Sequence, residues 1–251
     1  ADIDGQSLQI AVSAPGGEQI GPEWGHVGAG PGLTGQREAP ATGPALSPAK
    51  LAAFGEGNSA HVEIRHEFDG PIKAFGKAFW KTIMPLRPQA FAGKCPVVRA
   101  VYSDRYLRSP LAARLLYEVV RAMPGRHEET SIEIVSERTM RAATEPSVLH
   151  EAWTDDRDRT AVLEALLPRA SVALRTKQDC PHARSLLIDF ADGSSVTIYL
   201  DQGVGAWRTS GRRPVLFDGA ADVARQVAEL KRVDTDVEIQ EKGEHASPLW
   251  I

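Results

Sequence analysis

The stretch PHARSLLIDFADGSSVTIYLD, residues 181–201, decides the fold class. It contains two apolar segments, RSLLIDF (184–190) and SVTIYLD (195–201), and the residues ADG at 191–193 between them are typical of a hairpin turn. A third segment of the same kind, SVALRTK (171–177), comes just before. The sequence therefore predicts three successive strands, of which the last two pair as a hairpin.

On both sides of this hairpin, segments with the alternating apolar pattern of strands are separated by segments with the apolar period of helices. Ser109 and Pro110, for example, are typical of the cap and first position of a helix. We predict strands at 61–68, 95–104, 130–137 and 233–240, and helices at 71–84, 109–123, 155–170 and 220–232. From residue 95 to residue 232 the order is β-α-β-α-β-β-β-α, which predicts an α/β domain with a mixed sheet.

Residues 11–58 differ from the rest because they are crowded with Gly and Pro and have no sustained apolar period. The segment GAGPGLTG (28–35) looks like a phosphate loop, but it lacks the preceding strand and following helix that such loops require. We therefore expect three parts: a partly irregular, flexible arm at 1–58, a strand-helix extension at 59–93 and the α/β domain at 94–251.

Composition limits the partners. The 251 residues include 29 Lys and Arg against 33 Asp and Glu, for a net charge of -4, so nucleic-acid binding would need a local basic patch. Cys95 and Cys180 lack metal or redox spacing, which suits a reducing cytoplasm, although a single disulfide is the alternative. No apolar stretch has a membrane-spanning length and no signal pattern is present, so we expect a soluble cytoplasmic protein without a membrane partner. The chain begins at Ala1 rather than Met, which suggests processing or a longer parent chain.

His182 and Arg184 are the first candidate site residues. They stand two residues apart at the start of a strand, so both side chains should project to the same side. A histidine can act as nucleophile or acid/base, and an arginine can hold two phosphate oxygens. For His182 three interpretations stay open: a structural hydrogen bond, phosphate or partner binding without hydrolysis, and catalysis. Asp189, five residues after Arg184, should face the opposite side unless a bulge intervenes.

The end of the strand at 95–104 is the second candidate, because α/β sheets bind ligands at strand ends. Arg105 lies between Asp104 and Tyr106 and could contact phosphate, although residues here often cap the next helix instead. The segment WRTSGRR (207–213), with Arg208, is either a basic-aromatic patch for single-stranded nucleic acid or a solvated loop. His150 has no partner at metal-ligand spacing, and we expect neither a metal nor a cofactor.

The pattern His182, Arg184 and Asp189 resembles the H-x-K-x4-D signature of the phospholipase D-like superfamily, with Arg in place of Lys. The resemblance covers residues 94–232. CPVVRAVYSDRYLRSPLAARLLYEVV (95–120) looks like the opening strand and helix of one phospholipase D-like half domain. DGSSVTIYLDQGVGAW (192–207) is similar to the closing hairpin of single-motif binding modules, such as the carboxy-terminal domain of MIT-domain proteins. The chain also resembles the C-terminal part of large superfamily-2 helicases of bacterial phage-defence islands.

Active members of that superfamily combine two signatures, whereas this chain has one, and arginine does not replace lysine freely at a catalytic position. The resemblance thus implies a non-catalytic module that binds phosphate, nucleic acid or an acidic protein segment, working with a helicase or other defence-complex subunits. Together with the strand-end and basic-aromatic patterns above, the predicted ligand-binding residues are Asp104, Arg105, Tyr106, His182, Arg184 and Arg208. The alternative is a phosphodiesterase or nuclease that works as a dimer, with His182 as nucleophile and Arg184 as phosphate clamp.

Overall fold

The computed structural model describes residues 6–13, 59–64, 66–86, 91, 95–139, 145–200, 202–211 and 213–240. A seven-stranded sheet forms its centre, in the order β2-β1-β8-β7-β4-β5-β6. β4, β5 and β6 are mutually parallel, and all other neighbours are antiparallel. The predicted α/β domain with a mixed sheet is confirmed. The strands are β1 (Gln6–Ser13), β2 (Ser59–Ile64), β4 (Val97–Ser103), β5 (Ser131–Glu137), β6 (Ala170–Arg175), β7 (Arg184–Phe190) and β8 (Ser195–Leu200).

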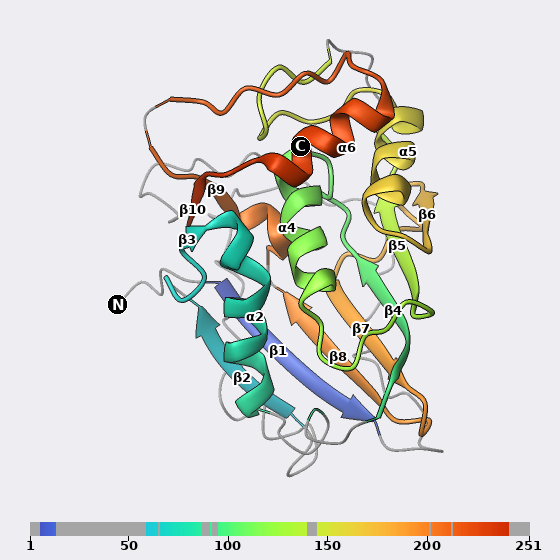
Figure 1. Cartoon of the computed structure of the whole chain (residues 1–251). Helices are drawn as coiled ribbons and strands as arrows, with labels where there is room; N and C mark the ends of the chain where they lie inside the picture. Colours follow the sequence, from blue (N-terminus) through green and yellow to red (C-terminus); the bar gives the residue numbers. More distant parts are fainter. Residues whose placement is uncertain are drawn as a thin grey trace, which may run out of the picture.

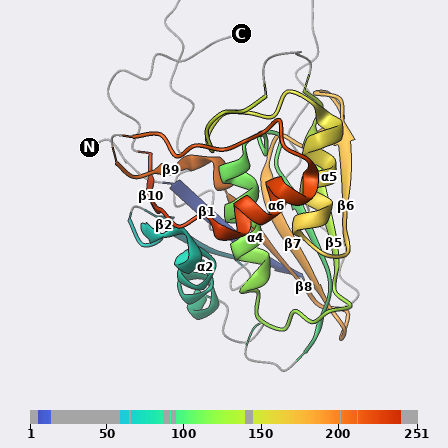
Figure 2. The same ribbon diagram turned by 45° about the horizontal axis from the view of Figure 1, so that its top comes forward.

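The helices α2 (Phe75–Ile83), α4 (Pro110–Arg121), α5 (Asp156–Leu166) and α6 (Val223–Arg232) lie on one face of this sheet (Figure 1). The view in Figure 2 shows α6 crossing in front of α4, with α5 beside β5 and β6. Each predicted helix is present. Ser109 Oγ accepts the Ala112 N–H at 3.2 Å, as the capping pattern predicted. Among the described residues no helix is both long and apolar enough to cross a bilayer.

A second sheet of three short strands packs beside the first: β3 (Gly70–Pro71), β10 (Asp236–Ile239) and β9 (Trp207–Thr209). β10 confirms the predicted last strand. β9 was not predicted, and it follows a short 3-10 helix, η3 (Gly203–Ala206), after β8. The two remaining 3-10 turns, η1 (Ile72–Ala74) and η2 (Met84–Leu86), flank α2.

The amino-terminal strand β1 changes the predicted division of the chain. Residues 6–13, which the sequence placed in the arm, lie between β2 and β8 and pair with both. β2 ends at Ile64, earlier than the predicted strand. Residues 14–58, with GAGPGLTG, lie outside the described residues.

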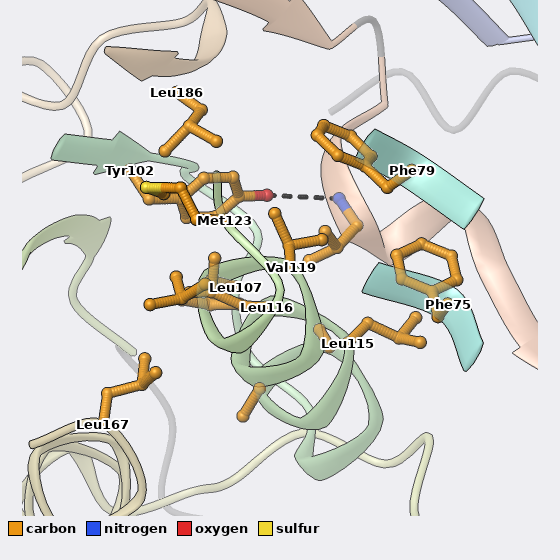
Figure 3. Packing of buried hydrophobic residues seen from close by; sticks show 14 of the residues in the cluster. Phe75, Phe79, Tyr102, Leu107, Leu115, Leu116, Val119, Met123, Leu167 and Leu186 are labelled. Atoms are coloured by element: carbon orange, nitrogen blue, oxygen red, sulfur yellow. Dashed lines mark hydrogen bonds between the residues drawn. The ribbon is translucent and has the colours of Figure 1, made fainter. Parts of the chain in front are cut away.

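The core lies between the sheet and α4. Leu116 and Val119 of α4 belong to one buried cluster with Tyr102 of β4 and Leu186 of β7, and Leu115 of α4 points toward Phe75 of α2 (Figure 3). In β7 the buried residues alternate, so that Leu186, Ile188 and Phe190 face the helices. Arg184 belongs to the same alternating series, and it therefore starts on the helix-covered side.

Asp189 faces the other side, as alternation predicted. Its Oδ2 lies 3.2 Å from Nη1 of Arg99 on β4, and Arg99 Nη2 lies 2.7 Å from Glu133 Oε2 on β5. Asp189 is thus joined to a surface ion-pair network and not to Arg184.

Candidate functional site

The candidate site lies at the edge of the sheet where the parallel strands β4 and β5 end. The residues that follow them, 104–109 and 138–139, meet at this edge with the loop after β6 and the first residue of β7. Such carboxyl ends are where α/β sheets place ligands. The topology therefore brings Asp104 and Arg184 together although 80 residues separate them in sequence.

Asp104 is the buried centre of this edge, with no exposed surface. Its Oδ2 accepts the Tyr102 hydroxyl at 2.8 Å, and its Oδ1 accepts the Tyr106 backbone N–H at 2.8 Å. Arg184 Nε lies 3.6 Å from Oδ1. The carboxylate thus orients both the loop after β4 and the first side chain of β7.

The turn after β8 closes over Asp104. Val204 donates its backbone N–H to the Tyr102 hydroxyl at 3.1 Å. Gly203 adopts a φ of +64°, which L residues with a side chain rarely take. A Cβ at this position would lie 2.2 Å from Asp104 Oδ2, so the turn approaches the carboxylate too closely for any residue but glycine.

Burial raises the pKa of Asp104, and hydrogen bonds from Tyr106 and Tyr102 and the charge of Arg184 oppose the shift. A carboxyl whose pKa is raised by folding binds its proton more tightly in the folded state, so its contribution to stability is full below the unfolded pKa and is lost as pH rises through the folded pKa. We therefore expect wild type to gain stability relative to Asp104→Asn as pH falls from neutral. Urea unfolding of both proteins across that pH range measures the difference. A difference that stays constant, or that favours the variant at acid pH, contradicts the assignment.

Arg184 and Tyr106 form the outer part of the site. The Arg184 side chain is 20% exposed, and its Cζ lies 4.8 Å from the centroid of the Tyr106 ring. Arg108 places its Cζ 5.5 Å from the same centroid, and Tyr106 is 42% exposed. A partly exposed tyrosine is therefore held against two guanidinium groups by cation–π contacts.

Arg105 points to the loop between β6 and β7. Its Nη2 donates to the carbonyls of Lys177 at 2.8 Å and Cys180 at 2.7 Å, and its Nη1 lies 3.3 Å from Nδ1 of the exposed His182. Arg105 therefore holds the loop and the imidazole together, which is a positioning role that the sequence did not predict.

Glu137, at the end of β5, contacts both Arg108, which lies against Tyr106, and Arg105, which lies against His182. Its Oε2 lies 3.2 Å from Arg108 Nη2 and 3.8 Å from Arg105 Nε. The buried Arg159 of α5 also holds Glu137, because its Nη2 donates to the Glu137 backbone carbonyl at 2.8 Å. A continuous series of contacts results, which we call the Asp104 cluster: His182, Arg105, Glu137, Arg108, Tyr106, Arg184 and Asp104. Its three arginines exceed its two carboxylates, which gives a local positive charge.

The structure brings five of the six predicted ligand-binding residues into this cluster. His182 and Arg184 both lie against the 104–106 loop, but His182 contacts Arg105 whereas Arg184 contacts Asp104 and Tyr106. Arg208 is not part of the Asp104 cluster. It lies on β9, and its Nε is 3.0 Å from Oε1 of Glu238 on β10. The interpretation of 207–213 as a basic-aromatic patch is not supported at Trp207, because that ring is buried against Phe68 and Phe75.

Sequence reasoning missed Glu137 and Arg108. Glu137 ends a predicted strand parallel to the one that ends near Asp104, so the rule that placed Asp104 at the ligand edge applies to it equally. Arg108 lies in the same loop as Arg105. In the sequence, Gly203 and Gly205 allow either a close backbone approach to a ligand or a turn, and the structure has a 3-10 turn there that lies close to Asp104. Among the described residues, no group of three His, Cys, Asp or Glu side chains is placed to hold a metal ion.

Residues 58–251 match the family model described as DEAD/DEAH box helicase YjiV, C-terminal domain. The chain belongs to this family, and the predicted association with a helicase is confirmed at that level. No curated protein and no solved structure matches the chain.

Proposed function

We propose that this helicase-associated domain binds nucleic acid without hydrolysing it, and that the Asp104 cluster holds the phosphate backbone. The observation that supports this most is the Arg184 guanidinium, held in place by Asp104 and Tyr106 at a ligand edge of the sheet. Arginine matches the geometry of phosphate and can bind two of its oxygens at once. Because Asp104 and Tyr106 already fix the side chain, less conformational entropy is lost when a phosphate binds.

Electrostatics supports a local rather than a global mode of binding. The chain carries a net charge of -4, so it has no overall attraction for a polyanion. The excess of arginine over carboxylate in the Asp104 cluster supplies a local attraction at this site. Binding should therefore weaken steeply with salt, with a slope set by the few phosphates contacted.

Nucleic acid fits the site better than an acidic protein segment for two reasons. The exposed Tyr106 ring offers an aromatic surface beside the cations, which a base or sugar can contact and a carboxylate does not need. The family is named for a nucleic-acid motor. The wider setting that we propose, a cytoplasmic DNA-defence system with a phospholipase D-like half domain, rests on the sequence resemblance.

The test compares labelled single-stranded and duplex DNA bound by wild type, Arg184→Met and Arg184→Lys. We expect Arg184→Met to weaken binding by about tenfold, the range of a lost hydrogen bond to a charged group. The slope of log K against log salt should also fall by about one. Arg184→Lys keeps the charge beside Asp104 and should bind with intermediate affinity. Fluorescence anisotropy over a salt series measures all three proteins.

Arg225→Met is the matched control, because Arg225 is an exposed arginine on α6 paired with Asp218 at 3.4 Å. It should change affinity by less than about twofold, as expected for a surface ion pair. If Arg184→Met and Arg225→Met behave alike, the site is elsewhere. If wild type cuts the DNA and His182→Ala abolishes cutting, the dimeric nuclease hypothesis replaces the binding module.

A further inference from the structure

We infer that Arg105 fixes neutral His182 in the tautomer that carries its proton on Nε2. His182 then presents a hydrogen-bond donor to a phosphate oxygen, and it does not present a nucleophilic nitrogen. The identity of the ligand rests on the proposed function, whereas the tautomer follows from the contacts of Arg105 alone.

The argument starts from the chemistry of the two side chains. A guanidinium group has only donors and stays protonated in proteins. Its Nη1 lies 3.3 Å from His182 Nδ1, so Nδ1 must be the acceptor of this hydrogen bond. A neutral imidazole carries one proton, and with Nδ1 accepting, that proton is on Nε2.

Arg105 is itself fixed, so this hydrogen bond is not a chance encounter of two mobile side chains. Its side chain is only 11% exposed and donates to the carbonyls of Lys177 and Cys180. Glu137 lies 3.8 Å from its Nε. Both carbonyls belong to the loop that ends at His182, so the same guanidinium sets the position of the loop and the proton of the ring.

The tautomer decides which chemistry His182 can perform. A histidine that acts through Nε2 as base or nucleophile needs a lone pair there, and an acceptor such as a carboxylate on Nδ1–H secures it. Here a cation occupies that place. Nε2 then bears a proton and donates, and a phosphate oxygen is a strong acceptor. The contact of Arg105 therefore favours recognition of phosphate over attack on it.

The tautomer can be measured on the intact protein without a ligand. The ¹⁵N chemical shifts of the His182 ring in mildly alkaline buffer should show a protonated Nε2 and an unprotonated Nδ1. Arg105→Met removes the donor, and the ring should then relax toward a mixture of tautomers. A wild-type spectrum with the proton on Nδ1 overturns the inference even if Arg105→Met does not fold.

The donor role is tested with a single-stranded DNA oligonucleotide. In His182→Gln the side-chain amide reaches about as far as Nε2, so affinity should stay within about threefold of wild type, while His182→Ala and His182→Asn should bind about tenfold more weakly. If Gln is as weak as Ala, His182 does not donate to the ligand and this inference is wrong, although Arg184→Met can still uphold the proposed function. If instead Arg184→Met leaves binding unchanged while the Nε2 proton is observed, the proposed function fails and the tautomer stands.

Discussion

Arg114→Met is expected to lower the free energy of unfolding by about 3 kcal/mol, the lower end of the range for breaking a buried ion pair, because Arg121 still pairs with Glu118. Arg114 and Glu118 of α4 are each 2% exposed and pair with one another. Arg114 Nη1 also donates to the Leu230 carbonyl near the end of α6. Removing the guanidinium leaves a buried carboxylate oxygen and a buried carbonyl without these hydrogen bonds where α4 and α6 meet.

Arg121→Met is the matched control, because Arg121 pairs with the same Glu118 from the surface. Its Nε donates to Glu118 Oε2 at 2.9 Å, but its side chain is 44% exposed, so solvent screens the pair and we expect a loss below about 1 kcal/mol. Urea unfolding of both variants gives the comparison. Equal losses in the two variants would mean that burial does not set the strength of this pair.

Gly203→Ala is expected to lower the free energy of unfolding by about 2–4 kcal/mol, through strain at a positive φ and overpacking of the site. The added methyl group would lie 2.2 Å from Asp104 Oδ2 and 2.9 Å from Arg184 Cδ. The turn or the carboxylate has to move, and the contact between Asp104 and Arg184 moves with it. We therefore also expect weaker DNA binding, measured on the fraction that stays folded.

Gly205→Ala controls for a methyl group added to the same short helix. Nothing lies within 4 Å of a Cβ at Gly205, so stability should change by less than about 0.5 kcal/mol, as at other surface positions, and DNA binding should not change. Thermal unfolding and the anisotropy assay check both. A Gly203→Ala protein as stable as Gly205→Ala would contradict the close packing of this turn on Asp104.

The elements that local patterns specify were predicted well. Ser109 and Pro110 start α4 where the capping pattern placed it, and the residues at 191–193 join β7 to β8 as a hairpin. Alternation placed Arg184 and Asp189 on opposite sides of β7. These features depend on neighbours in sequence, and a single chain contains that information.

The features that depend on distant pairing were not predicted. Nothing local in residues 6–13 indicates a partner near residue 200, and β9 is too short to give a period. In the site, the loop after β4 and the start of β7 were chosen on separate grounds, and only the sheet order brings them into contact. Arg105 was predicted to contact a ligand, whereas the structure shows it donating to the backbone carbonyls of Lys177 and Cys180. These partners lie more than 70 residues away in sequence, so no local pattern indicates them.

The position of β1 in the sheet determines when this domain can fold during translation. Of the seven strands of this sheet β1 is synthesised first, yet it pairs Leu8 with Leu200 of β8, which is the last of them to be synthesised. Pairing so remote in sequence slows folding, because the loop it closes is long. The ribosome must therefore synthesise β8 before the seven-stranded sheet can form completely. Until then, the edge of β1 that pairs with β8 has no strand beside it.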